Sequence, residues 1–349
     1  MSIAIIVTTF NNADSISKCL NSIKLFIKRI ENIDTRIILI DDASIDNTPK
    51  ILLEFSREIS STDLKRYKKN KGVSRSRNYG ISESLDTDYI LFVDGDDEIN
   101  INLADYLNKG KLVNDLYAFD FSIVGNKKEI QQSHLESGIV FNDKSISEYL
   151  FSYLIKPNKK SMFVSCWAKM YKTKILKNNV KLRFKEGMKI NEDALFVFSF
   201  IRKCKIIEYV NVLAYKYNDN STLIDRASFA VHSDVTQFFS IISALRQLRF
   251  YLIEKRQNID YVNSKIYHCI AAYTCIYSNR AWVRVSSFSE FLNLFYELKK
   301  IYKKTIIKKS LGIYNVNEAK GDKVLSFFLK HQFFLMAAII SFIKSLKRY

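Results

Sequence analysis

Residues 89–99 read YILFVDGDDEI, and this stretch decides the fold. It begins with a run of five apolar residues, the length of a strand that is covered on both faces in a parallel sheet. The carboxylates of Asp94, Asp96 and Asp97 follow at once. Carboxylates this close repel one another unless a cation compensates their charge. We therefore predict a buried strand with a divalent-cation site at its carboxyl end, the alternative being a solvated acidic turn.

Two earlier runs, IAIIV at 3–7 and RIILI at 36–40, have the same character. Helix-like segments lie between the runs, at residues 14–30, 46–59 and 74–85. In the first of these segments apolar residues recur at spacings of three and four, as in an amphipathic helix: Ile16, Leu20, Ile23 and Ile27. The alternation predicts an α/β fold with a Rossmann-like, mainly parallel central sheet flanked by helices. Such sheets bind ligands at the carboxyl ends of their strands.

The second half of the chain has a different pattern. Strand patterns fade from about residue 228, and helical periodicity continues in long segments at 229–252, 261–285 and 288–302. We predict a catalytic domain at 1–225, followed by a mostly helical C-terminal region at 226–349.

The amino-acid composition indicates which kinds of partner the protein binds and in which cellular compartment it works. The 349 residues include 54 Lys and Arg against 36 Asp and Glu, a net charge of +18, which indicates an anionic partner. Nucleic acid, an acidic membrane surface and phosphorylated substrates all fit that charge. The five cysteines are scattered and lack metal-ligand spacing, which favours the reducing cytoplasm.

A second acidic cluster follows the second predicted strand, at residues 41–44 (DDAS). Asp41 and Asp42 are placed to accept hydrogen bonds from a base or a ribose, as an acidic residue does in dinucleotide folds. The alternative is a helix start, in which Asp46 or Asn47 is the N-cap and Pro49 lies in the first turn. Both interpretations can hold together.

Six motifs, in this order and at these separations, resemble the family 2 glycosyltransferases. They are VTTFNN (7–12), LIDDASIDNT (39–48), NKGVSRSRNYGI (70–81), FVDGDD (92–97), CWAKMYKTKIL (166–176) and INEDALF (190–196). The resemblance covers about residues 3–217 and implies the GT-A fold.

The resemblance implies a nucleotide-sugar site. The family holds the nucleotide base with residues that correspond to Thr8 and Asp42, and we add their neighbours Phe10 and Asp41 to the same site. Asn70 and Arg77 match the phosphate side, where the planar guanidinium of an arginine pairs well with phosphate oxygens. A solvated basic helix face is the alternative for this segment.

The resemblance also implies a metal site and a catalytic base. Asp94 would face the ribose or the metal, and Asp96 would bind Mn²⁺ or Mg²⁺ between the two phosphates, in keeping with hard oxygen ligands. Asp193 would deprotonate the acceptor hydroxyl, and Glu192 would shape the acceptor pocket. Both acids also suit a helix N-terminus.

Two positions stay open. Trp167 is predicted to stack on an acceptor sugar, with a place in the core as the alternative. Many relatives have an Arg or His after the final strand, whereas this chain reads AYKYNDNST at 214–222. Lys216 and Tyr217 are the candidates to replace that residue, and His232 lies further on.

The C-terminal stretch 324–343 reads VLSFFLKHQFFLMAAIISFI and is interrupted by a Lys-His-Gln triplet at 330–332. It falls short of a membrane-spanning helix. Its second part precedes Lys344, Lys347 and Arg348, which predicts a membrane-surface helix within 324–349. A helix that packs on the domain or on a second copy is the alternative.

These observations predict an inverting glycosyltransferase. It would move a hexose or N-acetylhexosamine from a UDP-linked sugar to a hydroxyl of a cell-surface glycan, with lipid-linked glycans among the candidates. We expect a cytoplasmic protein without a nucleic-acid partner, and peripheral contact with the inner face of the membrane. A basic anion- or nucleic-acid-binding protein without transferase activity is the alternative, but it leaves the acidic motifs unexplained.

Overall fold

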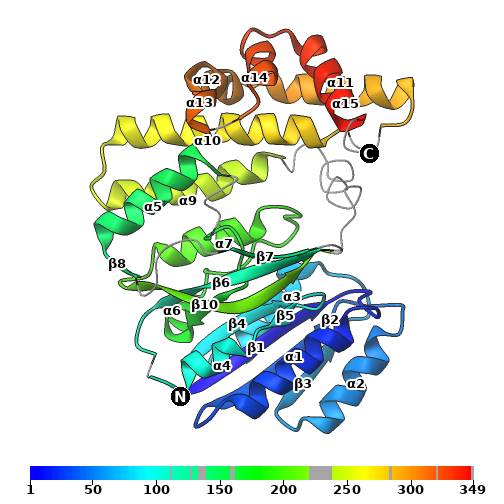
Figure 1. Ribbon diagram of the computed structural model, residues 1–349, viewed down its shortest axis with the longest axis vertical. Coiled ribbons are helices and arrows are strands. Elements are labelled where there is room, and N and C mark those ends of the chain that lie inside the picture. Colours follow the sequence, from blue (N-terminus) through cyan, green and yellow to red (C-terminus); the bar gives the residue numbers. More distant parts are fainter. Residues whose placement is uncertain are drawn as a thin grey trace. The chain divides into compact units, whose positions relative to one another are not determined.

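The computed structural model describes residues 1–110, 112–125, 128–132, 139–157, 162–219, 238–282, 285–319 and 321–346 (Figure 1). The chain forms two compact units. The first, an α/β unit, comprises Met1–Asn142, Met162–Met188 and Glu192–Asn220. The second, a helical unit, comprises Asp143–Ser161, Lys189–Asn191 and Ser221–Tyr349. Residues 143–161 thus join the helical unit from within the first half of the chain.

The first four strands of the α/β unit form a parallel sheet in the order β3-β2-β1-β4. They are β1 (Ser2–Thr9), β2 (Asp34–Asp41), β3 (Thr62–Arg66) and β4 (Tyr89–Asp94). The apolar runs that predicted strands lie in β1, β2 and β4 and are buried. In the register of the sheet Thr8 pairs with Asp94 and Thr9 with Asp41, so the predicted polar residues meet at one edge.

The other half of the sheet is mixed. Strand β9 (Lys169–Lys172) runs antiparallel to both its neighbours, β4 and β6 (Leu116–Gly125). Strand β10 (Ile207–Asn218) runs parallel to β6 and pairs antiparallel with β5 (Glu98–Ile99). Two short strands complete the sheet, β7 (Lys128–Gln132) on β6 and β8 (Ile139–Phe141) on β10. The predicted α/β fold is confirmed.

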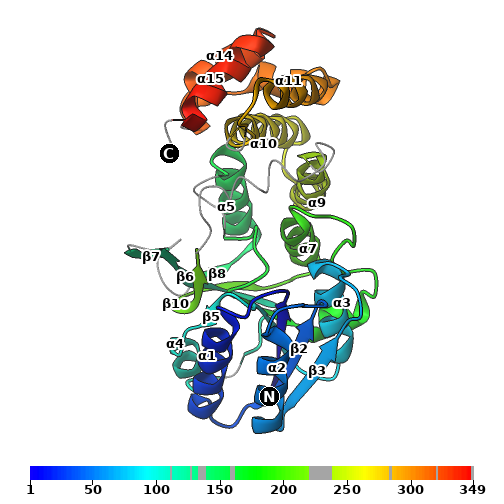
Figure 2. The same cartoon turned by 90° about the vertical axis from the view of Figure 1, so that its right-hand side faces the viewer.

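Helices cover both faces of the sheet. Helices α1 (Ile16–Arg29), α2 (Thr48–Glu58) and α4 (Asn102–Leu107) share a hydrophobic core with one set of alternating strand residues, such as Ile3, Ile5 and Val7 (Figures 1 and 2). The alternate residues face the other way. Among them, Phe92 packs edge-on against Tyr171, Phe184 and Phe196.

Helix α3 (Val73–Glu83) lies unusually close to β1. A Cβ atom on Gly80 would be 2.4 Å from Cγ2 of Ile6, well inside contact distance. Only glycine permits this approach without a shift of the Ile6 side chain, the helix or the strand. The helix carries Arg77, so this contact helps to fix the depth at which the guanidinium lies.

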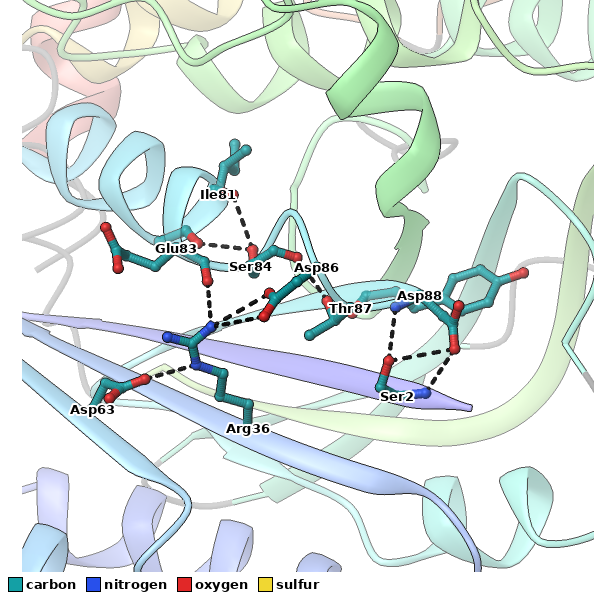
Figure 3. Close-up of polar contacts among 11 residues, drawn as sticks. Ser2, Arg36, Asp63, Ile81, Glu83, Ser84, Asp86, Thr87 and Asp88 are labelled. Atoms are coloured by element: carbon teal, nitrogen blue, oxygen red, sulfur yellow. Dashed lines mark hydrogen bonds and ion pairs between the residues drawn. The ribbon is translucent and has the colours of Figure 1, made fainter.

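Polar contacts hold the opposite edge of the sheet, where the strands begin (Figure 3). Arg36 donates to the carbonyl oxygen of Glu83, near the end of α3, at 2.6 Å and to Asp63 of β3 at 2.7 Å. The backbone N–H of Ser2 donates to the carboxylate of Asp88 at 2.8 Å. A cation at a helix C-terminus interacts favourably with the helix dipole. These contacts tie α3 to β2 and β3 at the end remote from Arg77.

The helical unit is built around α10 (Ile259–Arg280), which contacts α5, α9, α12 and α15. Its other helices are α5 (Asp143–Ile155), α9 (Ser240–Glu254), α11 (Phe288–Tyr302), α12 (Thr305–Ile313), α13 (Val316–Ala319), α14 (Lys323–Lys330) and α15 (Phe334–Leu346). Two further helices, α6 (Thr173–Asn178) and α7 (Glu192–Ile201), belong to the α/β unit. The predicted helical character of this half is confirmed. Among the described residues, no helix is both long enough and apolar enough to cross a bilayer.

Candidate active site

A cleft of about 280 Å³ opens where β1 and β4 end. It is lined by Thr8, Thr9, Phe10, Asn12, Asp42, Val73, Ser76, Arg77, Asp94, Gly95 and Asp96. These residues come from four of the six motifs. The register of the parallel strands therefore brings the predicted polar clusters to one place.

The loop after β1 forms one wall of the cleft. The hydroxyl of Thr9 donates to Oδ1 of Asn12 at 2.8 Å, and the backbone N–H of Phe10 donates to the same oxygen at 3.0 Å. Asn12 N–H in turn donates to the hydroxyl of Thr48. The loop is thus held by its own side chains, and the Phe10 ring is left 45% exposed at the cleft.

The two aspartates of the DDAS motif have different positions. Asp42 lines the cleft, and its two carboxylate oxygens accept the N–H groups of Lys71 and Gly72, each at 2.7 Å. Asp41 is fully buried, where it accepts the Ser44 N–H and pairs with Arg66. Asp42 therefore positions the loop before α3, and Asp41 braces the motif from beneath.

Asp94 ends β4, and Asp96 and Asp97 follow in the turn, as the sequence predicted. Asp96 is exposed, and its partial removal from water together with the charge of Asp94 raises the pKa of Asp96 to about 6. Asp97 is buried, and burial with the charges of Asp94 and Asp96 raises its pKa. Its carboxylate accepts from the Tyr215 hydroxyl at 2.7 Å and from the Asn218 N–H at 2.8 Å.

Arg77 connects this acidic turn to the start of α7. Its guanidinium is 4% exposed; Nη2 donates to Asp94 at 2.7 Å and Nη1 donates to Asp193 at 2.5 Å. The second oxygen of Asp193 accepts the Cys166 N–H at 3.1 Å. Glu192 lies 3.6 Å from Nη1, and burial followed by the charge of Asp193 raises the pKa of Glu192. One buried cation thus holds three acids from two distant segments.

The model of glycosyl transferase family 2 matches residues 4–179, just over half of the chain. The chain belongs to glycosyl transferase family 2.

Curated relatives of this family 2 chain include glycosyltransferases from bacteria. It is 26% identical over 207 residues to the poly(ribitol-phosphate) beta-N-acetylglucosaminyltransferase TarP of Staphylococcus aureus, a match that covers 58% of each protein. It is 29% identical over 229 residues to the glycosyltransferase GlyA of Streptococcus pneumoniae, covering 62% of this chain and 30% of GlyA. The matches thus span less than two thirds of the length of these relatives.

The fold of the family 2 chain matches a solved structure over nearly its whole length. The crystal structure of S. aureus TarS, residues 1–349, in complex with UDP-GlcNAc superposes with a TM-score of 0.67 at 16% identity, covering 98% of this chain and 90% of that chain. The complex of the same TarS fragment with UDP gives a TM-score of 0.65. The predicted GT-A fold followed by a helical region is therefore confirmed.

Not all of the predicted site residues of this family 2 chain lie in the cleft. Thr8, Phe10, Asp42, Arg77, Asp94 and Asp96 all line the cleft. Asn70 is exposed just before the loop that Asp42 holds. Trp167 stacks on Tyr215 at 4.9 Å and on Tyr217 at 5.5 Å between ring centroids, so these neighbours already occupy part of its aromatic surface. His232 lies outside the described residues.

Tyr215, whose hydroxyl contacts the acidic turn of the family 2 site, was not predicted from the sequence. The Tyr215 hydroxyl contacts both the backbone N–H of Asp94, at 3.2 Å, and the carboxylate of Asp97. The alternation in AYKY at 214–217 places Tyr215 and Tyr217 on one face of a strand, opposite Lys216, and this is the one signal in the sequence that points to Tyr215. Lys216, the suggested substitute for a missing basic residue, lies next to it in β10 and does not line the cleft.

A second missed residue is Lys169 on β9, which is 2% exposed. Its ammonium donates to the carbonyl oxygen of Trp167 at 3.1 Å, and burial lowers its pKa to about 7. A buried amine of this kind loses its charge readily. Near neutral pH the family 2 core therefore contains a lysine that is only partly charged.

We expect the substitution Lys169→Met to remove a pH-dependent component of stability. The folded pKa, about 7, lies below the unfolded value near 10.4, so between these limits the unfolded chain binds the extra proton. Wild-type stability should rise from pH 7 to pH 10 relative to the variant, by about 1–4 kcal/mol. Urea unfolding at several pH values measures this difference. The exposed control Lys174→Met should follow the wild type, and a difference for Lys169→Met that is constant with pH would contradict the assignment.

Proposed function

We propose that this protein is an inverting glycosyltransferase that moves a hexose or N-acetylhexosamine from a UDP-linked sugar to a hydroxyl of a cell-surface glycan. The contact that carries the proposal is the pair of bonds from Arg77 to Asp94 and to Asp193. This pair of bonds joins the acidic turn of the cleft to Asp193 in the first turn of α7. Donor and acceptor chemistry can then take place on two sides of one cation.

The donor side is supported by the shape and polarity of the cleft. Phe10 offers an exposed ring against which a base can pack, and Thr8 and Asp42 provide polar groups beside it. Nε of Arg77 is buried without a hydrogen-bond acceptor in the described part of the chain, so a phosphate oxygen would satisfy it. The UDP and UDP-GlcNAc complexes of the TarS fragment favour a uridine nucleotide here.

The residues also fit a divalent metal. Asp96 is exposed, and its partial removal from water together with the charge of Asp94 raises its pKa; a bound cation would offset both effects. The described residues contain no group of three or more His, Cys, Asp and Glu arranged for a metal. Mg²⁺ and Mn²⁺ commonly take one or two carboxylates together with substrate phosphates, so Asp96 with Asp94 would suffice. When bound, the ion would neutralise charge on the departing diphosphate.

The acceptor side is supported by Asp193 at the N-terminus of α7. Arg77 and the Cys166 N–H hold its two oxygens, which fixes the direction of the carboxylate. We propose that one carboxylate oxygen of Asp193 accepts the proton of the acceptor hydroxyl while the oxygen of that hydroxyl attacks the anomeric carbon. The bond to the diphosphate breaks on the opposite face, so the anomeric configuration inverts. Glu192 would border the acceptor.

Calorimetric titration tests the donor site. UDP should bind the wild type in the presence of Mn²⁺, and Asp96→Asn should weaken that binding at least tenfold because one metal ligand is lost. The wild-type affinity should also fall as the pH drops through about 6, where Asp96 becomes protonated and can no longer bind the metal. The control Asp34→Asn changes an exposed acid at the other end of the sheet and should bind normally. UDP binding whose affinity depends neither on Mn²⁺ nor on Asp96 would refute the metal site.

A second test addresses the base. Asp193→Asn should keep UDP affinity but lower turnover roughly 10²–10⁴-fold, the usual contribution of a general base. UDP release can be followed with UDP-GlcNAc and poly(ribitol phosphate), the donor bound by TarS and the acceptor in the name of TarP. Glu192→Gln serves as the neighbouring control and should lose less. If Asp193→Asn retained more than a tenth of the turnover, the base would lie elsewhere.

We further propose that α14 and α15 contact the inner face of the cell membrane, which would bring the enzyme to a lipid-linked acceptor. Helix α15 turns its small residues inward, with Ala337, Ala338 and Ser341 buried. Phe334 is also buried, but five larger apolar residues of the helix are each at least 36% exposed: Leu335, Met336, Ile339, Ile343 and Leu346. A helix with this inverted distribution presents an apolar surface to its surroundings.

Charge favours a lipid surface over a second copy of the chain. From Lys323 to Leu346 there is no acidic residue, whereas Lys323, Lys330 and Lys344 are basic. Lys344 pairs with Asp322, which leaves the other two lysines exposed. Two such faces would repel each other across a dimer interface, but the face would be attracted by anionic headgroups.

Sedimentation with lipid vesicles tests this contact. The wild type should bind phosphatidylglycerol vesicles, and the triple substitution Leu335→Gln, Ile339→Gln and Ile343→Gln should reduce binding at least tenfold by removing apolar area. The control Leu25→Gln, Leu53→Gln and Val180→Gln changes three exposed apolar residues of the α/β unit and should bind as the wild type does. Equal binding by both triples would refute the surface, and dissociation of a dimer by the first triple would favour the second copy.

A further inference from the structure

A second concave surface lies beside the cleft in the α/β unit. This groove has a volume of about 630 Å³ and is formed by β3, α3 and the segment that precedes α7. Arg75, Asn78 and Tyr79 of its lining come from the motif at 70–81, but the reaction proposed above does not use the groove. Cations outnumber acids in its lining, which comprises three cations, two tyrosines, Asn78, Ser82, Phe184 and one acid, Glu186.

Helix α3 separates the groove from the cleft. Val73, Ser76 and Arg77 face the cleft, whereas Arg75, Asn78, Tyr79 and Ser82 line the groove. The second set recurs at spacings of three and four, so it forms one side of the helix. An α-helix is about 10 Å across, so the groove begins roughly one helix width from the reacting groups.

The cations of the groove are not all neutralised by the protein. Arg75 pairs with Glu186 at 3.0 Å. Arg183 donates to the backbone carbonyl oxygen of Leu182, and Lys65 lies over the Tyr79 ring with Nζ 5.3 Å from the centroid. Neither of these two contacts supplies a negative charge. Burial lowers the pKa of Arg183, so its charge is unfavourable where it lies, and a ligand anion would relieve that.

The remaining groups suit a ligand rich in hydroxyls. Tyr67 and Tyr79 meet edge to face at 6.4 Å between centroids, and Ser82 lies on the same side of α3. Because Lys65 covers a face of Tyr79, the pair does not offer the open stacking platform that a nucleic-acid base requires. Tyrosine combines apolar ring surface for C–H groups with a hydroxyl for hydrogen bonds.

The groove has a rigid wall that would favour a defined ligand position. The side-chain amide of Asn78 donates to the Phe184 carbonyl oxygen at 2.8 Å, and its oxygen accepts the Phe184 N–H at 2.8 Å. These two hydrogen bonds tie α3 to the segment before α7 and thereby fix Arg183 beside the helix. Pre-organised cations lose less entropy on binding than mobile surface lysines do.

We propose that the groove binds an anionic stretch of the glycan acceptor, with Lys65 and Arg183 pairing its phosphate or carboxylate groups and the tyrosines contacting its sugar or polyol units. The identity of the ligand as the acceptor rests on the proposed transferase function. The groove would hold units of the chain away from the hydroxyl that reacts. It would thereby make a charged polymer a better acceptor than a neutral one.

Direct binding tests the proposal without turnover. Fluorescently labelled poly(ribitol phosphate), polygalacturonate, dextran and a single-stranded oligonucleotide would be titrated into the full chain at one ionic strength, without UDP-sugar. One or both anionic glycans should bind, the phosphate and carboxylate polymers distinguishing the acid group, and neutral dextran should not. The double substitution Lys65→Ala and Arg183→Ala should weaken that binding at least tenfold.

A matched control separates the groove from overall charge. Lys50→Ala with Arg57→Ala removes the same charge from exposed positions on α2 and should change affinity less than twofold. Retained Mn²⁺-dependent UDP binding by both doubles would show that the cleft is intact, and Asp96→Asn should bind the glycan normally even if donor binding fails. Equal losses in the two doubles, stronger binding of the oligonucleotide, or binding of dextran would overturn the proposal.

Discussion

The buried guanidinium of Arg77 is the constraint on which the rest of the site depends. A cation that is almost fully removed from water is stable only beside acids, and here Asp94, Asp193 and Glu192 supply them. The acids depend on it in turn, since without Arg77 they would repel one another. Loss of one partner in such a group usually costs about 3–5 kcal/mol. The same ion pairs therefore hold the turn after β4 and the start of α7 in place.

The fold was predictable from sequence where the physics is local. Runs such as those at 3–7 and 89–93 bury both faces of a strand, and their composition alone identifies them. The parallel register then follows, and it brings Thr8, Asp42 and Asp94 to one edge. The order of the motifs identified the family, which the family model confirms. These residues were found because strand ends and acidic turns are encoded within a few positions.

The parts that were not predicted depend on contacts between distant segments. Strand β9 has four residues and an antiparallel direction that no pattern within it encodes. The pairing of Arg77 with Asp193 joins residues 116 positions apart, and the sequence alone assigned this arginine to phosphate. Lys169 is a common surface residue by type, so its burial is visible only once β9 lies inside the sheet. The sequence likewise suggested an acceptor contact for Trp167 without its tyrosine neighbours.

The close approach of α3 to β1 at Gly80 has a consequence for how this site can change. Gly80 holds no ligand and donates no side-chain hydrogen bond, yet it sets how far the helix lies from the strand and so where Arg77 meets its acids. The absence of a Cβ atom at Gly80 thus helps to determine the position of Arg77, three residues earlier in the helix. The geometry of the site therefore depends in part on a core position that no survey of polar groups would include.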